Sequence, residues 1–228
     1  MRGSHPETCG GGRRGPAIII DVSTYVPNHQ IRAAHTEHTV TVYQAFSPAI
    51  AEPAVARQRL DVGFKRQRMT WIKPSFLWMM YRSDWATAPG QERVLAVELT
   101  RAGFEAGLGL AAASSYTPAL HATREQWRED LRRSPVRFQW DPERDLRLRP
   151  LPWRSLQLGL SGAAVDQYLD SWTVSLADVT EQAHRIRDLA RRGDPDGAAQ
   201  AAALLPVERP YPLPGALATR LGATAADG

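Results

Sequence analysis

The chain has 228 residues, of which 43% are hydrophobic and 23% are charged, and no apolar run approaches the roughly 18 residues of a membrane helix. Its net charge of +4, from 28 lysines and arginines against 24 aspartates and glutamates, is too small to establish a nucleic-acid-binding surface. The single cysteine, Cys9, excludes an internal disulfide, and no cysteines and histidines have zinc-site spacing. We therefore predict a cytoplasmic protein without a bound metal.

The two ends of the chain are predicted to lie outside the folded domain. Residues 1–16 are interpreted as a disordered leader because they are rich in glycine and hold little that could pack, and residues 1–5 resemble an expression-vector remnant. Residues 17–205 are predicted to form a single α+β domain. Residues 206–228 are rich in proline and are predicted to be an extended tail.

Strands are predicted where β-branched and aromatic residues alternate, and helices where apolar residues recur at helical spacing after a capping residue or a proline. In chain order, these patterns predict a strand at 17–22, a strand at 39–46, a helix at 50–59, a strand at 69–72, a helix at 75–82, a turn at 87–91, a strand at 93–99, a helix at 102–110, a helix at 123–133, a strand at 136–140, a turn at 141–144, a strand at 153–160, a helix at 162–172 and a helix at 176–192. Short strands and helices without regular alternation indicate an α+β fold, with a mixed or antiparallel central sheet and flanking helices.

The most unusual segment is 66–85, which holds three of the seven tryptophans, three arginines and one of the two lysines. This composition is typical of a site that binds a flat or anionic ligand. Lys73 precedes the helix predicted at 75–82, where a bound anion would offset its repulsion from the helix dipole, although a solvated lysine is an equal alternative. Trp71 is the candidate for stacking on a ring, whereas the aromatic residues of the helix itself suit a core.

Further candidates lie on the strand at 39–46 and near 141–144. Tyr43 and Gln44 should point to opposite faces of their strand, and Gln44 could bond a ligand amide or simply satisfy a sheet edge. Glu143, close to Trp140, is the first candidate for a catalytic carboxylate, with an exposed turn as the alternative. We further predict that one concavity is lined by two strand residues and three residues of the unusual segment, namely Tyr43, Gln44, Thr70, Lys73 and Arg82.

Four motifs together resemble a known family. They are Val-Tyr-Gln-Ala-Phe at 42–46, the long segment 68–83, Gln-Glu-Arg-Val-Leu-Ala at 91–96, and Gln-Trp-Asp-Pro-Glu-Arg at 139–144. The chain is identified from them as a member of domain-of-unknown-function family 4291 over roughly residues 30–179. That family name implies no activity.

The strand ending in Tyr-Gln-Ala-Phe, followed by Ser-Pro and a helix, also resembles the first strand and helix of the ADP-ribosyltransferase group. This resemblance implies an enzyme that consumes the nicotinamide dinucleotide NAD, with Gln44 standing where that group has histidine or arginine. Arg32 or Arg68 would then hold the pyrophosphate, and Tyr43 or Trp71 would stack on the nicotinamide. Glu143 would stabilise positive charge developing on the ribose.

Three other functions fit the same residues. An RNA- or DNA-binding module would use the arginines and aromatic side chains without a catalytic carboxylate. A biosynthetic enzyme would bind an aromatic small molecule in the same pocket. A protein–protein interface would bury the tryptophans and methionines of the segment 66–85.

Overall fold

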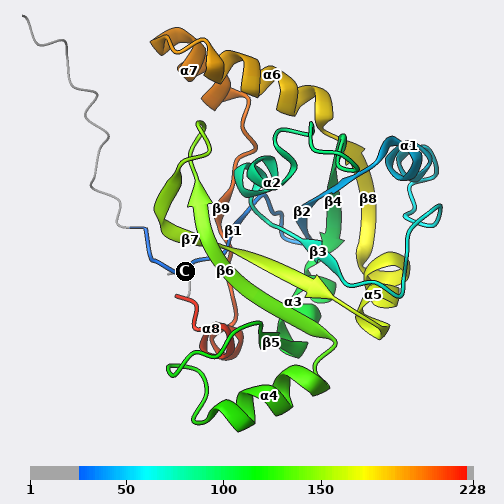
Figure 1. The fold of residues 1–228 in the computed structure, drawn as a ribbon, viewed down its shortest axis with the longest axis vertical. Helices are drawn as coiled ribbons and strands as arrows, with labels where there is room; N and C mark the ends of the chain where they lie inside the picture. Colours follow the sequence, from blue (N-terminus) through cyan, green and yellow to red (C-terminus); the bar gives the residue numbers. More distant parts are fainter. Residues whose placement is uncertain (1–25, 225–228) are drawn as a thin grey trace, which may run out of the picture.

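The computed structural model describes residues 26–224 (Figure 1). The strand predicted at 17–22 and the leader predicted at 1–16 therefore lie outside the described residues. The strands are β1 (Arg32–Ala33), β2 (Thr39–Phe46), β3 (Thr70–Ile72), β4 (Arg93–Thr100), β5 (Ala111–Ala113), β6 (Val136–Arg144), β7 (Pro150–Leu160), β8 (Thr173–Asp178) and β9 (Arg209–Pro210). The helices are α1 (Pro48–Arg57), α2 (Phe76–Ser83), α3 (Arg101–Leu110), α4 (Arg124–Arg133), α5 (Ala163–Gln167) with its π-helical continuation η1 (Tyr168–Trp172), α6 (Thr180–Arg191), α7 (Pro195–Ala203) and α8 (Gly215–Leu221).

The strands form two larger sheets and a short ribbon. One sheet is antiparallel, in the order β2-β4-β8, and the other has the order β3-β7-β6-β5, with β5 parallel to β6. A backbone bridge between Tyr43 and Lys73 links the end of β3 to β2 and so joins the two sheets. The α+β class with mixed and antiparallel sheets is therefore confirmed.

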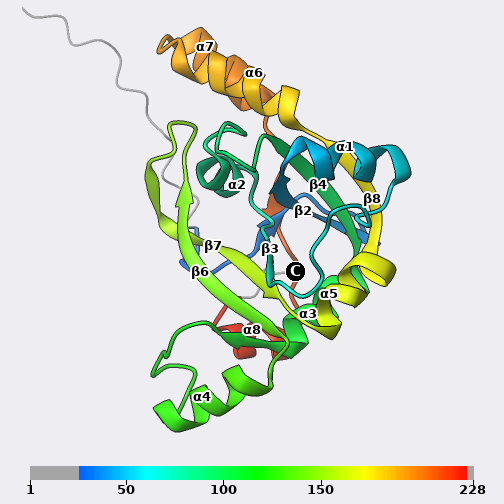
Figure 2. The ribbon, with the colours of Figure 1, turned by 45° about the vertical axis from the view of Figure 1, so that its right-hand side comes forward.

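Two hydrophobic cores lie on opposite faces of the β2-β4-β8 sheet. Side chains alternate between the faces of a strand, so Val42 enters the larger core, which also contains residues from β6, β7, α3 and η1. Its neighbour Tyr43 enters the smaller core with Phe76 of α2 and Ile186 of α6. Figures 1 and 2 show α6 and α7 together at one end of the molecule, with α4 at the other.

The helix starts follow the expected capping chemistry. The Ser75 side chain accepts a hydrogen bond from the Trp78 backbone N–H, so α2 begins at Phe76. Thr100 and Thr123 cap α3 and α4 in the same way. At α1, Ser47 occupies the cap position with Pro48 as the first helical residue, but its side chain makes no capping bond.

Two of the predicted elements are wrong in part. Residues 141–144, predicted as a turn, continue β6, because a register irregularity between Pro142 and Arg144 lets the strand accommodate the proline. Residues 176–178, predicted as the start of a helix, instead end β8, and α6 begins only at Thr180.

Residues 206–228 were predicted to be an extended tail, but the described part of this segment is not simply extended. Residues 209–210 pair with β1, and residues 215–221 form α8. Tyr211 and Leu221 are almost completely buried in the larger core, and this burial holds the segment against the rest of the fold. The prolines stop the chain from forming a long helix here but do not prevent it from packing.

Candidate functional site

A polar cavity of about 430 Å³ lies between α2 and the face of the β3-β7-β6-β5 sheet that is turned away from the larger core. It combines aromatic rings, two cations, one carboxylate and two amides. Its lining residues are Trp71, Lys73, Trp78, Tyr81, Arg82, Gln139, Asp141 and Gln157.

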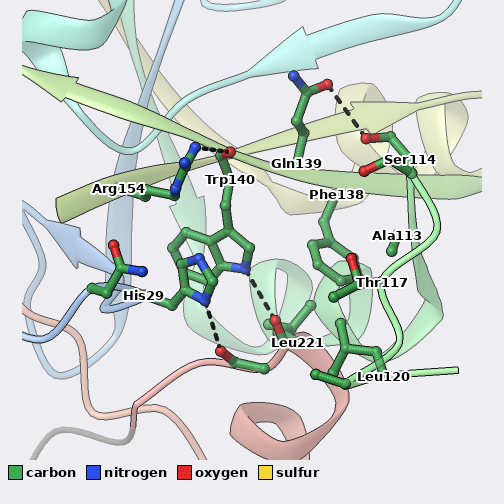
Figure 3. A pocket seen from close by; sticks show the side chains of 14 residues that line it. His29, Ala113, Ser114, Thr117, Leu120, Phe138, Gln139, Trp140, Arg154 and Leu221 are labelled. Atoms are coloured by element: carbon green, nitrogen blue, oxygen red, sulfur yellow. Dashed lines mark hydrogen bonds between the residues drawn. The ribbon is translucent and has the colours of Figure 1, made fainter. Parts of the chain in front are cut away.

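Strand alternation brings these side chains to one face. On β6, Phe138 enters the larger core, whereas Gln139 and Asp141 point to the opposite face. Figure 3 shows Gln139 on one side of β6, with Phe138 and Trp140 on the other. Gln157 of β7 is the register partner of Gln139, so the two amides lie side by side across the strands.

The carboxylate of Asp141 is fixed by these two amides. Gln139 Nε2 donates a hydrogen bond of 2.7 Å to one carboxylate oxygen, and Gln157 Nε2 donates one of 2.6 Å to the other. Both glutamines must therefore hold their amide oxygens away from Asp141. The Gln139 oxygen accepts a hydrogen bond from Ser114, at 3.3 Å.

The ammonium of Lys73 is the buried cation of this cavity. The residue is only 5% exposed, and the hydrogen bond recorded for its Nζ is a long one of 3.5 Å, donated to the Trp71 carbonyl oxygen. Burial lowers the pKa of Lys73 from 10.5 to about 8, and the nearby positive charge of Arg82 contributes to this, opposed by Asp141. Among residues 26–224, no carboxylate lies within 4.0 Å of this ammonium.

The aromatic wall is held in place by stacking. The rings of Trp78 and Tyr81, one helical turn apart on α2, stack with centroids 5.1 Å apart. The guanidinium of Arg144 lies 3.6 Å from the Tyr81 ring centroid, in a cation–π contact. This contact ties the end of β6 to α2.

Trp71 occupies its position because Gly159 on β7 has no side chain. A Cβ atom at Gly159 would lie 2.9 Å from the Trp71 ring, closer than real Cβ atoms approach. Gly159→Ala should therefore displace the ring, lower the free energy of unfolding by about 1–2 kcal/mol and weaken any ligand that stacks on Trp71. Tryptophan fluorescence and denaturant unfolding would measure both effects. Gly215→Ala, where the added Cβ meets nothing within 4 Å, is the control, and equal behaviour of the two variants would contradict the packing role.

The predicted single concavity is wrong, because its residues divide between the two faces of β3. Trp71 and Lys73 face the cavity together with Arg82, whereas Thr70 points to the other face. There the Gln44 amide nitrogen donates a hydrogen bond to the Thr70 hydroxyl, and the Tyr168 hydroxyl donates one of 3.0 Å to the Gln44 amide oxygen. Gln44 is thus bonded at both ends of its amide group.

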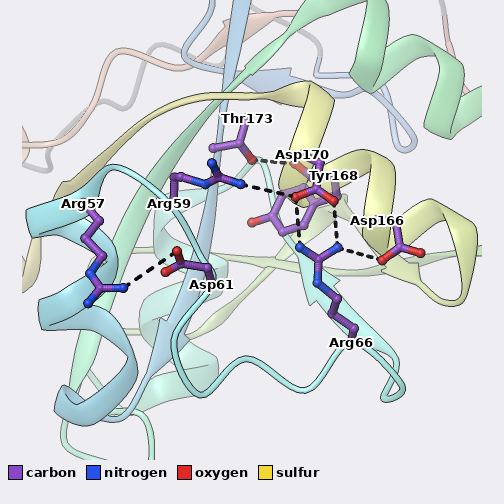
Figure 4. Close-up of polar contacts among 8 residues, drawn as sticks. All are labelled: Arg57, Arg59, Asp61, Arg66, Asp166, Tyr168, Asp170 and Thr173. Carbon is purple, nitrogen blue, oxygen red and sulfur yellow. Dashed lines mark hydrogen bonds and ion pairs between the residues drawn. The ribbon is translucent and has the colours of Figure 1, made fainter.

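Arg68 and Thr70 line a separate cavity of about 480 Å³. Figure 4 shows how the loop before β3 is attached to the segment that contains Asp166 and Asp170. The Arg66 guanidinium donates two hydrogen bonds to Asp170, at 2.8 and 2.9 Å, and one of 2.8 Å to Asp166. These exposed ion pairs fasten the loop to α5 and η1.

The remaining predicted residues lie around the start of α2. Tyr43 packs edge-on against Phe76 in the smaller core, and its hydroxyl pKa is raised by burial. Glu143 accepts a hydrogen bond of 2.9 Å from Ser75, and burial also raises its pKa. Glu208, which sequence reasoning missed, accepts a bond of 2.7 Å from the Phe76 N–H, and burial raises its pKa to about 8. Arg32 bonds the backbone carbonyl of Glu208.

Another cavity, of about 420 Å³, lies on the Trp140 side of β6 and is drawn in Figure 3. The His29 and Trp140 rings stack there, with centroids 5.0 Å apart. Arg154, His29 and Trp140 each direct a nitrogen at a backbone carbonyl oxygen. Because these polar groups are already paired, the cavity that contains Lys73 is the stronger candidate for a ligand site.

Residues 26–224 contain no group of three histidine, cysteine, aspartate or glutamate side chains arranged to hold a metal ion. Within the same residues, no helix has the length and apolar character needed to cross a membrane.

The comparisons with known proteins agree with the four sequence motifs. No curated protein matches the chain. A family model described as a domain of unknown function, DUF4291, matches residues 30–211 and so covers the described cavity and most of the fold. The chain belongs to the DUF4291 family.

Proposed function

We propose that the cavity between α2 and β6 binds a small anionic molecule with a flat ring, such as a nucleotide. The observation that carries this proposal is the buried ammonium of Lys73, which has no carboxylate partner among residues 26–224 and shares the cavity with Arg82. Burying an unpaired charge is costly, and a bound anion would remove that cost by pairing with both cations.

The rest of the lining suits a planar group attached to that anion. Trp71 lies beside Lys73 and offers a half-buried aromatic face for stacking. Gln157 uses its amide nitrogen on Asp141, which leaves its amide oxygen to accept a hydrogen bond from the edge of a ring. Charge would therefore set affinity, and the aromatic ring and amide oxygen would set selectivity.

The dinucleotide NAD is one ligand within this class, and ADP-ribosyl transfer stays a more specific prediction. Binding of an anion at Lys73 and Arg82 does not require ADP-ribosyl transfer. Gln44 is bonded to Thr70 and Tyr168 on the other face of β3, so a catalytic role for Gln44 would require that network to open. Glu143 lies beyond Asp141 on β6 and is bonded to Ser75 at the start of α2.

A thermal-shift series with nucleotides, dinucleotides and sugar phosphates tests the proposal. A ligand at 100 times its dissociation constant should stabilise the wild type by about 2.7 kcal/mol. Arg82→Gln should weaken binding roughly ten- to a hundredfold, because it removes a charge-assisted hydrogen bond worth about 1.5–3 kcal/mol.

Arg68→Gln is the matched control, since Arg68 is also an exposed arginine of the motif segment but lines the other cavity. Its affinity should stay within about threefold of the wild type. Equal losses in both variants would argue against this cavity. Binding only of oligonucleotides, with affinity falling steeply as salt increases, would favour a nucleic-acid-binding module instead.

A further inference from the structure

Lys73 has the surroundings of a reactive amine as well as those of an anion-binding group. It is 5% exposed, lines a cavity and has no carboxylate partner among the described residues. Asp141, the carboxylate in the same cavity, is held by Gln139 and Gln157. A second cation, Arg82, lies close enough to lower the pKa of Lys73. Desolvation and a neighbouring cation both favour the neutral amine, which is the nucleophilic form.

We infer that the Lys73 amine forms an imine with an aldehyde or ketone that carries an anionic group. This inference rests on the proposed binding site and narrows its ligand to a carbonyl compound. Arg82 would hold the anionic group, and the ring of the ligand would stack on Trp71. Lys73 would thus be a catalytic residue that bonds its substrate covalently, rather than a fixed positive charge.

The reaction needs no further reactant. The neutral Lys73 nitrogen attacks the carbonyl carbon, and the new C=N bond replaces the C=O bond. The carbonyl oxygen leaves as water, taking the two protons that the nitrogen loses. At pH 7.5, a pKa of about 8 gives roughly two-hundred-fold more neutral amine than a pKa of 10.5 does. Because a less basic amine is also a weaker nucleophile, we expect a net rate gain of about tenfold or more.

The chain makes this step easy to test because it has only two lysines, Lys73 and the exposed Lys65. The full-length protein is incubated with pyridoxal phosphate, an aromatic aldehyde with a phosphate group, and is then reduced with borohydride. Intact-mass and peptide analysis locate the adduct. The inference predicts an adduct on Lys73 that forms about ten times faster than the adduct on Lys65, and peptide analysis separates both from labelling of the α-amino group.

Two variants and one competitor complete the experiment. Lys73→Arg keeps the positive charge but cannot form an imine, so it should lose the fast adduct. Lys65→Arg should react like the wild type. A nucleotide that binds the cavity should slow labelling of Lys73 and leave that of Lys65 unchanged.

The outcomes separate this inference from the proposed function. Labelling of Lys73 no faster than of Lys65, in a protein that binds nucleotides, would overturn the imine and leave the binding site intact. Fast labelling of Lys73 without any nucleotide binding would support the imine and refute the nucleotide. Lysine labelling that stays equally fast in Lys73→Arg would also overturn the inference, because the adduct would then lie on Lys65.

Discussion

Lys73→Met should raise the free energy of unfolding at pH 7 by up to about 3 kcal/mol, while it abolishes binding of anionic ligands. The stability gain follows from the pKa of Lys73, which burial lowers from 10.5 to about 8, a difference that corresponds to about 3 kcal/mol. The folded protein carries this cost whenever Lys73 is protonated, and methionine has a similar length without the charge. Urea unfolding of both proteins at pH 7 measures the difference.

The lowered pKa of Lys73 also predicts how the stability difference between the wild type and Lys73→Met changes with pH. Because the folded pKa lies below the unfolded value, the unfolded chain holds the proton more tightly between pH 8 and pH 10.5. The wild type should therefore gain stability relative to Lys73→Met as the pH rises through this window. Lys65→Met, at an exposed position, should change stability by less than about 0.5 kcal/mol. A large loss of stability in Lys73→Met at pH 7 would contradict the account.

Gln44→Leu should lower the free energy of unfolding by about 2–4 kcal/mol, because it leaves two buried hydroxyls without a partner. Tyr168, fully buried, donates its hydrogen bond to the Gln44 amide oxygen, and Thr70 accepts one from the amide nitrogen. Chemical denaturation with tryptophan fluorescence gives the value.

A double-mutant cycle supplies the control for Gln44. In the Gln44→Leu background, Tyr168→Phe removes the unpaired hydroxyl, so the double variant should be more stable than the sum of the single effects predicts, by about 1–2 kcal/mol. Strict additivity would mean that the bond between Tyr168 and Gln44 does not stabilise the fold.

Local sequence patterns predicted much of the framework, because strand alternation and helix caps act over a few residues. The strand at 39–46 and the helix predicted at 75–82 are confirmed, since both depend on residues that are close in the sequence. The turn predicted at 141–144 is wrong because pairing of β6 with β7 outweighs the local preference of its proline. The helix α8 was missed because the prolines before it suggested an extended chain.

The candidate site was predicted only in part. The segment 66–85 supplies Trp71, Lys73 and Arg82, as its composition indicated. The predicted helix-start position of Lys73 did not reveal that its side chain is buried. The pairing of Gln139 with Gln157 was also missed, although alternation along the predicted strand at 136–140 already placed Gln139 and Phe138 on different faces. The proximity of the two glutamines depends on the register between β6 and β7, which no local pattern specifies.

The titration of Lys73 itself tests the central claim most directly. The titration is followed by NMR with lysine that carries a nitrogen isotope at its side-chain amine. The spectrum of the full-length protein then contains only two lysine signals, and Lys73→Arg identifies the one from Lys73. The account predicts a pKa of about 8 for Lys73 in the free protein, and a higher value once an anionic ligand pairs with the ammonium. A pKa near 10.5 that no nucleotide or phosphorylated ring compound changes would contradict it.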